Sequence, residues 1–151
     1  MNGDLPEWVH QRDGALREVS LPIGESPVSD WVKVLLYLTG HGQLDRVTAM
    51  PPDLERRFRH AHSLRRSELA AAMTDALALQ AASMDWVVNG STFRFYLWDD
   101  TEVAFGILPD PRDQEQLATL RGVCESLASL FGRSVTIRHE HGDYPPVVLS
   151  P

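Results

Sequence analysis

The spacing of apolar positions along the chain changes most clearly near residue 83. Before that point, apolar residues recur three and four positions apart, which is typical of helices with one buried face. The pattern predicts helices over residues 26–40, 52–63 and 67–82, the first opened by a Ser-Pro cap and ended by a glycine. Breakers on both sides of residues 42–51 predict a short extended segment there.

After residue 83, apolar and polar residues alternate, which predicts an antiparallel three-stranded meander over residues 84–108. Asn89-Gly90 favours a two-residue hairpin turn, because both central positions of a type I′ turn need positive φ. A second turn is predicted at Asp99-Asp100. One side of the meander is apolar throughout and should pack against helices. It carries Met84, Trp86, Val88, Phe93, Phe95, Leu97, Val103, Phe105 and Ile107.

Three further segments complete the predicted fold. An aspartate cap and a proline predict a helix over residues 110–132, and residues 134–139 read as a final strand. A turn signal at residues 12–14 predicts a short hairpin near the amino terminus. The proline-containing tail, residues 142–151, is excluded from a central strand. The chain is therefore predicted to be a single α+β domain over residues 1–151, with a mainly antiparallel sheet packed against two to four helices.

Composition fits one globular domain. A chain of 151 residues, 43% of them hydrophobic, is long enough to bury a core without disulfides or metal. No apolar stretch approaches the roughly 18 residues that a membrane span needs. The single cysteine, Cys124, excludes an internal disulfide framework, and its place in an apolar helical stripe predicts core packing. We expect a cytoplasmic protein without a membrane partner.

Charge changes the list of partners. The chain has 21 acidic and 14 basic residues and a net charge of −7, which disfavours nucleic acid as a general partner. The exception is residues 53–66, where five arginines against Asp53 and Glu55 leave a local charge of +3. Those arginines are Arg56, Arg57, Arg59, Arg65 and Arg66. They form either a solvated helix face or a patch that binds phosphate or an acidic partner.

A metal site is conceivable at His139-Glu140-His141, with Asp143 two residues further on. Residues two apart on a strand project to the same side, so both imidazoles could approach one ion. The alternative is that the strand ends near Ile137 and both histidines are solvated. No nucleophile elbow, phosphate-binding loop or dinucleotide motif is present, so we predict no catalytic residue and no cofactor.

The aromatic residues Tyr96 and Trp98 are predicted to point away from the apolar side of the meander. Either further helices cover them, or they form an exposed patch that binds a partner. Both side chains combine an apolar ring with a polar group, which is typical of interfaces.

The order of elements from Ser67 to Gly132 resembles roadblock/dynein-light-chain domains. The likeness is carried by Thr101-Glu102-Val103-Ala104-Phe105-Gly106-Ile107-Leu108-Pro109-Asp110-Pro111 and the apolar stripe from Leu117 to Phe131. It implies a small regulatory domain that dimerises and binds a protein such as a small GTPase, without chemistry of its own. The helices before Ser67 and the strand after Gly132 depart from that family.

These observations predict a non-enzymatic protein-interaction or regulatory module that forms oligomers or binds another protein. The candidate partner-binding residues are Tyr96, Trp98, Arg56, Arg57 and Arg59. Two alternatives remain open: a metal-dependent enzyme or sensor centred on His139 and His141, and anion or nucleic-acid binding through the Arg56–Arg66 helix.

Overall fold

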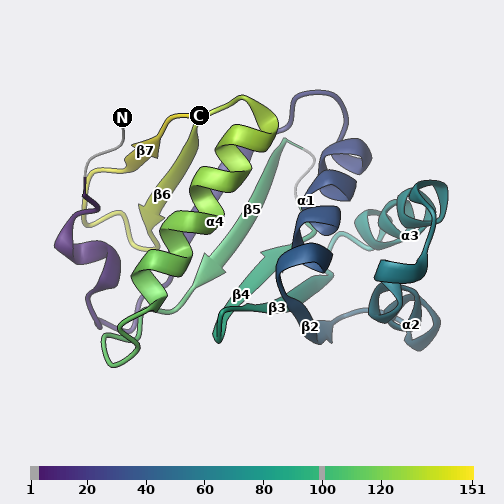
Figure 1. The fold of residues 1–151 in the computed structure, drawn as a ribbon, viewed down its shortest axis with the longest axis horizontal. Helices are drawn as coiled ribbons and strands as arrows, with labels where there is room; N and C mark the ends of the chain where they lie inside the picture. Colours follow the sequence, from purple (N-terminus) through teal and green to yellow (C-terminus); the bar gives the residue numbers. More distant parts are fainter. Residues whose placement is uncertain (1–3, 99–100) are drawn as a thin grey trace.

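The protein is organised around one antiparallel sheet of seven strands (Figure 1). The computed structural model describes residues 4–98 and 101–151; the turn predicted at Asp99-Asp100 lies outside them. The strands are β1 (Arg17–Pro22), β2 (Gln43–Thr48), β3 (Ser83–Val88), β4 (Ser91–Tyr96), β5 (Glu102–Ile107), β6 (Val135–His139) and β7 (Val147–Leu149). Their order across the sheet is β2-β3-β4-β5-β1-β6-β7. The α+β class and the antiparallel sheet are thus confirmed, and the sheet is larger than the sequence predicted.

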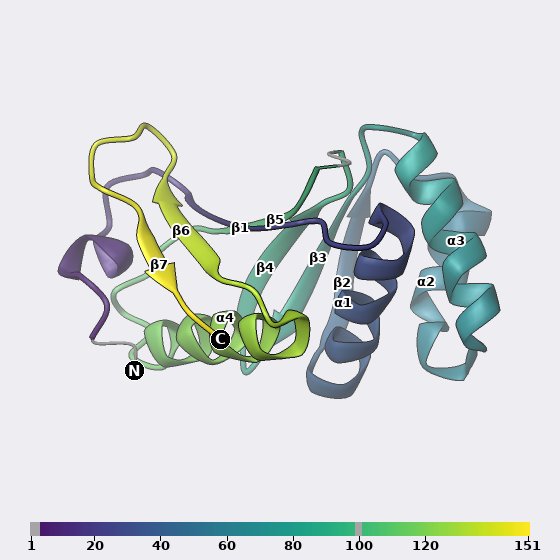
Figure 2. The same ribbon diagram turned by 90° about the horizontal axis from the view of Figure 1, so that it is seen from above.

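Two helices lie on the same side of this sheet. The α-helices of the described residues are α1 (Pro27–His41), α2 (Pro52–Arg59), α3 (Arg66–Ala78) and α4 (Gln116–Phe131), and the 3₁₀ helices are η1 (Glu7–His10) and η2 (Ala61–Ser63). Helices α1 and α4 cover the sheet, whereas α3 packs on α1, and α2 contacts α3 and the β2 edge (Figures 1 and 2). None of the described helices is both long and apolar enough to cross a membrane.

The alternation of the sequence explains which side of the sheet is covered. The apolar positions of β3, β4 and β5 are all nearly inaccessible to solvent and join the core with α1 and α4. Asn89 and Gly90 have φ values of 49° and 79°, as the predicted hairpin turn requires. The Ser26 side chain accepts a hydrogen bond from the Ser29 backbone N–H, so the predicted cap of the first helix is also present.

The predicted amino-terminal hairpin is wrong. Residues 7–10 form η1, and β1 inserts between β5 and β6 instead of pairing with its neighbour in sequence. Val19 and Leu21 of β1 are fully buried by this insertion. A central position buries more apolar surface than an isolated hairpin could, and two-stranded hairpins are marginal alone.

The helix predicted to start at Asp110 starts at Gln116. The Asp110 carboxylate accepts a hydrogen bond from the Arg112 backbone N–H, and the Asp110 N–H donates to Oε1 of Gln116. These local bonds fold residues 110–115 into turns, which is the alternative that aspartate side chains offer to a helix. Aspartate and proline therefore mark a turn ahead of the helix.

Both edges of the sheet are protected against pairing with another chain. At the β2 edge, the Arg59 guanidinium donates to the carbonyl oxygens of Leu44 and Asp45, and a bulge interrupts the register between Leu44 and Arg46. At the other edge, β7 is only three residues long and follows Pro145 and Pro146. Charge, bulges, short strands and prolines are the usual devices that prevent edge-to-edge association.

Candidate functional site

The side of the sheet opposite α1 and α4 carries no helix in the described residues (Figure 2). We call it the open face. The strand registers place two rows of side chains across it. One row is Arg46, Asp85, Arg94, Gly106, Glu18 and Arg138, and the other is Thr48, Ser83, Tyr96, Ala104, Ser20, Thr136 and Val148. The alternative in which further helices cover Tyr96 and Trp98 is therefore wrong.

Tyr96 is the large side chain at the centre of the open face. It sits opposite Ala104 on β5, and its ring crosses that strand above Gly106. A Cβ at Gly106 would lie 3.2 Å from the Tyr96 hydroxyl oxygen and 3.4 Å from Cε2. Glycine at this position thus lets the ring lie flat against the strand, where it is half-buried.

Trp98 extends the aromatic surface beyond the end of β4. Its side chain is 55% exposed, and its ring lies 4.6 Å from that of Tyr96, at an interplanar angle of 51°. Together the two rings border a hollow of about 360 Å³, which we call the Trp98 hollow. The other residues lining it are Leu16, Glu18, Val19, Ser20, Glu102, Ala104, Phe105, Arg138 and Glu140.

The charged groups of the Trp98 hollow are mostly acidic. Glu140 is fixed in place, because its Oε2 accepts the Leu16 N–H at 2.9 Å and its own N–H donates to the Leu16 carbonyl oxygen. Arg138, opposite Glu18 in the register, donates to the Ser20 hydroxyl at 3.4 Å. Three carboxylates, including Glu102, therefore face one guanidinium group in this hollow.

The environment of Tyr96 raises the pKa of its hydroxyl. Burial raises the pKa of its hydroxyl above the usual value, and the carboxylates of Glu18, Asp85 and Glu140 raise the pKa further, while Arg94 opposes them. A neutral phenol that donates a hydrogen bond is thus the stable form.

A second hollow of about 410 Å³ adjoins the first, since Leu16 and Tyr96 line both. Within it, Arg94 binds Asp85 through two hydrogen bonds, Nε to Oδ1 at 2.8 Å and Nη2 to Oδ2 at 3.2 Å. Asp110 and Asp113 also line it, so this hollow too has more carboxylates than guanidinium groups.

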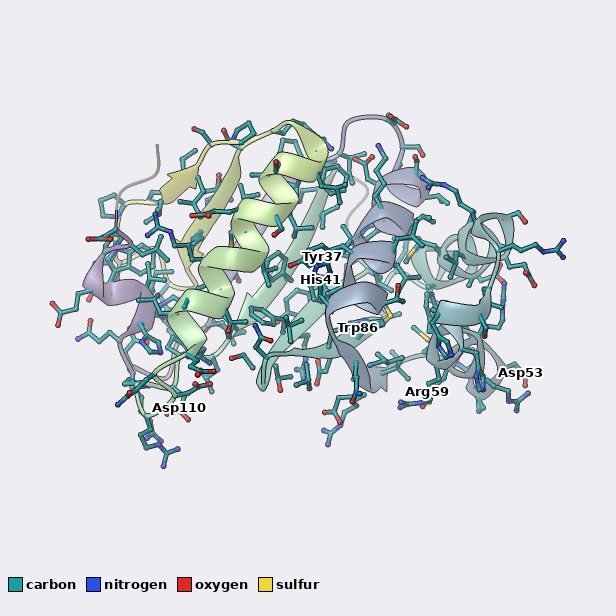
Figure 3. All side chains as sticks on the ribbon, in the orientation of Figure 1. Tyr37, His41, Asp53, Arg59, Trp86 and Asp110 are labelled. Atoms are coloured by element: carbon teal, nitrogen blue, oxygen red, sulfur yellow. The ribbon has the colours of Figure 1, made fainter. Side chains whose placement is uncertain are left out.

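The arginine run of residues 53–66 is largely neutralised by local partners. Ion pairs join Arg56 to Asp53, Arg57 to Asp75, Arg59 to Glu55 and Arg65 to Glu68. Figure 3 shows Asp53 and Arg59 on α2, at the end of the molecule away from α4. The arrangement fits a solvated helix face better than an anion site.

The proposed metal ligands are not brought together as a metal site. Among the residues that the structure describes, no group of three or more histidine, cysteine or acidic side chains could hold a metal ion. His139 is buried, its Nε2–H donates to Oδ2 of Asp13 at 2.8 Å, and its Nδ1 accepts the His141 N–H at 3.2 Å. Both ring nitrogens are therefore occupied within the fold. Asp143 Oδ2 lies 3.8 Å from Nδ1 of His139, and the His141 side chain is mostly exposed.

Sequence reasoning missed the most deeply buried charge in the described residues. The Arg17 side chain is completely inaccessible, and its guanidinium donates to the carbonyl oxygens of Trp8, Gln11 and Ala15 and to both carboxylate oxygens of Asp13. Asp13 also accepts from His139, so one carboxylate links the amino-terminal segment to β6. The alternation on β1 places Arg17 on the same side as Val19, which was the available signal.

Acid should weaken this link through Asp13. Its hydrogen bonds from Arg17, followed by that from His139, hold the pKa of Asp13 far below its usual range. Its contribution to stability is therefore complete above the unfolded carboxyl pKa of about 3.9 and is lost as the pH falls below that value. We expect the melting temperature of Asp13→Asn to be lower than that of the natural protein at pH 7. Between pH 5 and pH 2, the melting temperature of Asp13→Asn should fall by less than that of the natural protein.

The control for this acid titration is Asp53→Asn, because Asp53 is exposed on α2. Its melting curve should keep the full acid dependence. Equal pH profiles for Asp13→Asn and the natural protein would show that Asp13 does not carry the effect.

A further hollow, on the opposite side, lies between α1 and α4. Tyr37 and His41 of α1 stack at 4.2 Å in this gap (Figure 3), which has a volume of about 480 Å³. The wall on α4 includes Ala118, Gly122 and Ser126. Cys124, on the same helix, is fully buried, and burial raises its thiol pKa to about 12, so it is inert.

Comparisons with protein-family models, with curated proteins and with solved structures find no match to this chain. The resemblance to roadblock domains over residues 67–132 thus stays a prediction.

Proposed function

We propose that this chain is a non-enzymatic protein-interaction module of the cytoplasm and that it binds its partner through the open face. The carrying observation is that this face is uncovered in the described residues although Tyr96 and Trp98 lie on it. The strands predicted over residues 84–108 correspond to β3 to β5, which are three of the seven strands of this face. An exposed aromatic patch beside shaped hollows is typical of protein interfaces.

The sheet edges support the same assignment. Because Arg59, the β2 bulge and the proline-flanked β7 prevent strand addition, association through the backbone is disfavoured. Contact through side chains on the open face remains. A regulatory role fits such a surface, and the oligomeric state distinguishes a second copy from another protein.

Removal of Trp98 tests the proposal. We expect Trp98→Ala to fold normally, because the side chain is 55% exposed, and to weaken association about tenfold or more, as is usual for an aromatic interface residue. Tyr96→Ala should act in the same direction with some loss of stability. Sedimentation of the purified protein and capture of partners by the tagged protein measure the effect.

Leu36→Ala and Leu130→Ala are matched controls. Both residues are exposed apolar side chains, on α1 and α4 respectively, so they lie on the side of the sheet opposite the open face. They should leave association within about twofold of the natural value. If Trp98→Ala and Tyr96→Ala fold and change no association, the open face is not the interface.

A further inference from the structure

We propose that the segment bound in the Trp98 hollow is a basic stretch of the partner protein, with an arginine or lysine side chain held by Tyr96, Trp98 and the surrounding carboxylates. This inference rests on the proposed function and adds the chemistry of the partner.

Unpaired carboxylates are the first observation. No ion pair joins Glu18 or Glu102 to a basic side chain within residues 4–98 and 101–151, although the hollow holds both groups together with Glu140. The one guanidinium in the hollow, that of Arg138, donates to Ser20. Carboxylates gathered on one surface repel each other, and a bound cation relieves that repulsion.

The aromatic pair is the second observation. The rings of Tyr96 and Trp98 are tilted at 51° instead of packing flat against each other, and both residues line the same hollow. The face of a tyrosine or tryptophan ring attracts cations, with guanidinium groups preferred. The aliphatic stem of the same side chain covers apolar ring surface, which explains why an exposed tryptophan suits this position. The carboxylates that raise the Tyr96 pKa would stabilise the same positive charge.

The shape of the open face favours a chain segment over a single small cation. The Trp98 hollow adjoins the second hollow at Tyr96, and the second hollow adds the carboxylate of Asp113, whereas its Asp85 and Asp110 are paired with Arg94 and Arg112. Alternate side chains of an extended segment project to one side roughly 6.5–7 Å apart, so successive basic residues could occupy both hollows.

Other occupants fit less well. Nucleic acid would place phosphates beside Glu18, Glu102 and Glu140, while the arginines on α2 are already paired. A metal ion lacks a suitable ligand group in the described residues. A second copy stacked face to face would bring its own acidic hollow against this one.

A synthetic decapeptide of alternating arginine and serine, capped at both ends, is the probe. The control peptide has the same sequence with citrulline, the neutral isostere, in place of each arginine. Trp98 reports binding selectively, because acrylamide reaches it while Trp8, Trp31 and Trp86 are buried. At about 150 mM salt, which shortens the range of unspecific attraction, the arginine peptide should protect Trp98 from acrylamide. The citrulline peptide should bind at least tenfold more weakly.

Two double variants separate the local charges from the overall charge. Glu18→Gln/Glu102→Gln should weaken binding of the arginine peptide about tenfold. Glu7→Gln/Glu115→Gln removes the same number of charges from exposed sites outside the hollow and should change binding less than threefold. Equal weakening by both variants, or no protection of Trp98 at millimolar peptide, overturns the inference.

The peptide result and the proposed function can fail separately. If the citrulline and arginine peptides bind equally well, the open face still binds extended chains, but the partner is not selected by charge. If neither peptide binds and Trp98→Ala still abolishes an association, the proposed function stands and only the basic segment is wrong.

Discussion

Arg17→Met is expected to lower the free energy of unfolding by about 3–5 kcal/mol, because the buried guanidinium satisfies several buried acceptors, each of which costs about 1–3 kcal/mol when it loses its donor. Methionine matches the length of the arginine stem and is apolar, so it leaves little empty space. It removes the guanidinium donors to the carbonyl oxygens of Gln11, Ala15 and Trp8, of which that of Trp8 keeps the Gln11 N–H.

Loss of Arg17 should also loosen the contact between the two ends of the chain. Trp8 stacks on Tyr144 at 5.2 Å and meets the His139 ring at 6.2 Å, and Arg17 lies over the Trp8 ring. Hydrogen exchange at residues 5–16 should therefore accelerate more than exchange in β3 to β5.

Urea unfolding of Arg17→Met beside Arg12→Met provides the measurement. Arg12 is exposed in the same segment, so its replacement should change stability by less than about 0.5 kcal/mol. Similar stability for both variants would mean that the buried guanidinium contributes no more than a surface charge.

Two glycines at the end of α1 should respond to alanine with opposite signs. A Cβ at Gly42 would lie 2.4 Å from the Val87 carbonyl oxygen and 2.9 Å from Cγ2 of Val88, so β2 and β3 would have to separate. We expect Gly42→Ala to cost about 1–3 kcal/mol, as overpacking of a core does. The φ of Gly42 is −155°, which any residue can adopt, so the cost is steric.

Gly40→Ala is the matched control, two residues earlier. Gly40 lies within α1 and no atom approaches within 4 Å of its Cβ position. Alanine there should raise stability by about 0.5–1 kcal/mol, because it restricts the unfolded chain and favours helix. Thermal or urea unfolding measures both variants. A destabilised Gly40→Ala, or a neutral Gly42→Ala, would contradict the packing described at this end of the helix.

These glycines illustrate how far the sequence could predict the helix end. The sequence pattern predicted that this helix ends at Gly40. The helix continues to His41, whose Nδ1 forms a hydrogen bond with the Tyr37 carbonyl oxygen. Gly42 is the residue that packs closely against β3. The sequence carries no sign of this closure, because β3 begins some forty residues later in the chain.

The sequence likewise predicted only part of the candidate site. Alternation placed Tyr96 and Trp98 on the side opposite Phe95, and that placement depends only on neighbours in one strand. Whether helices cover that side depends on where α1 and α4 pack. The carboxylates of the Trp98 hollow come from β1, from β5 and from the end of β6, so no local pattern could bring them together.

The sequence by itself determined the helices of the middle third, the hairpin at Asn89-Gly90 and the apolar side of β3 to β5, because spacing and turn chemistry act over a few residues. Only the tertiary structure decided that β1 lies between β5 and β6, that Arg17 is buried and shares Asp13 with His139, and that one face stays uncovered. Asp13 and His139 are 126 residues apart, and contacts at such separation are selected by the whole core.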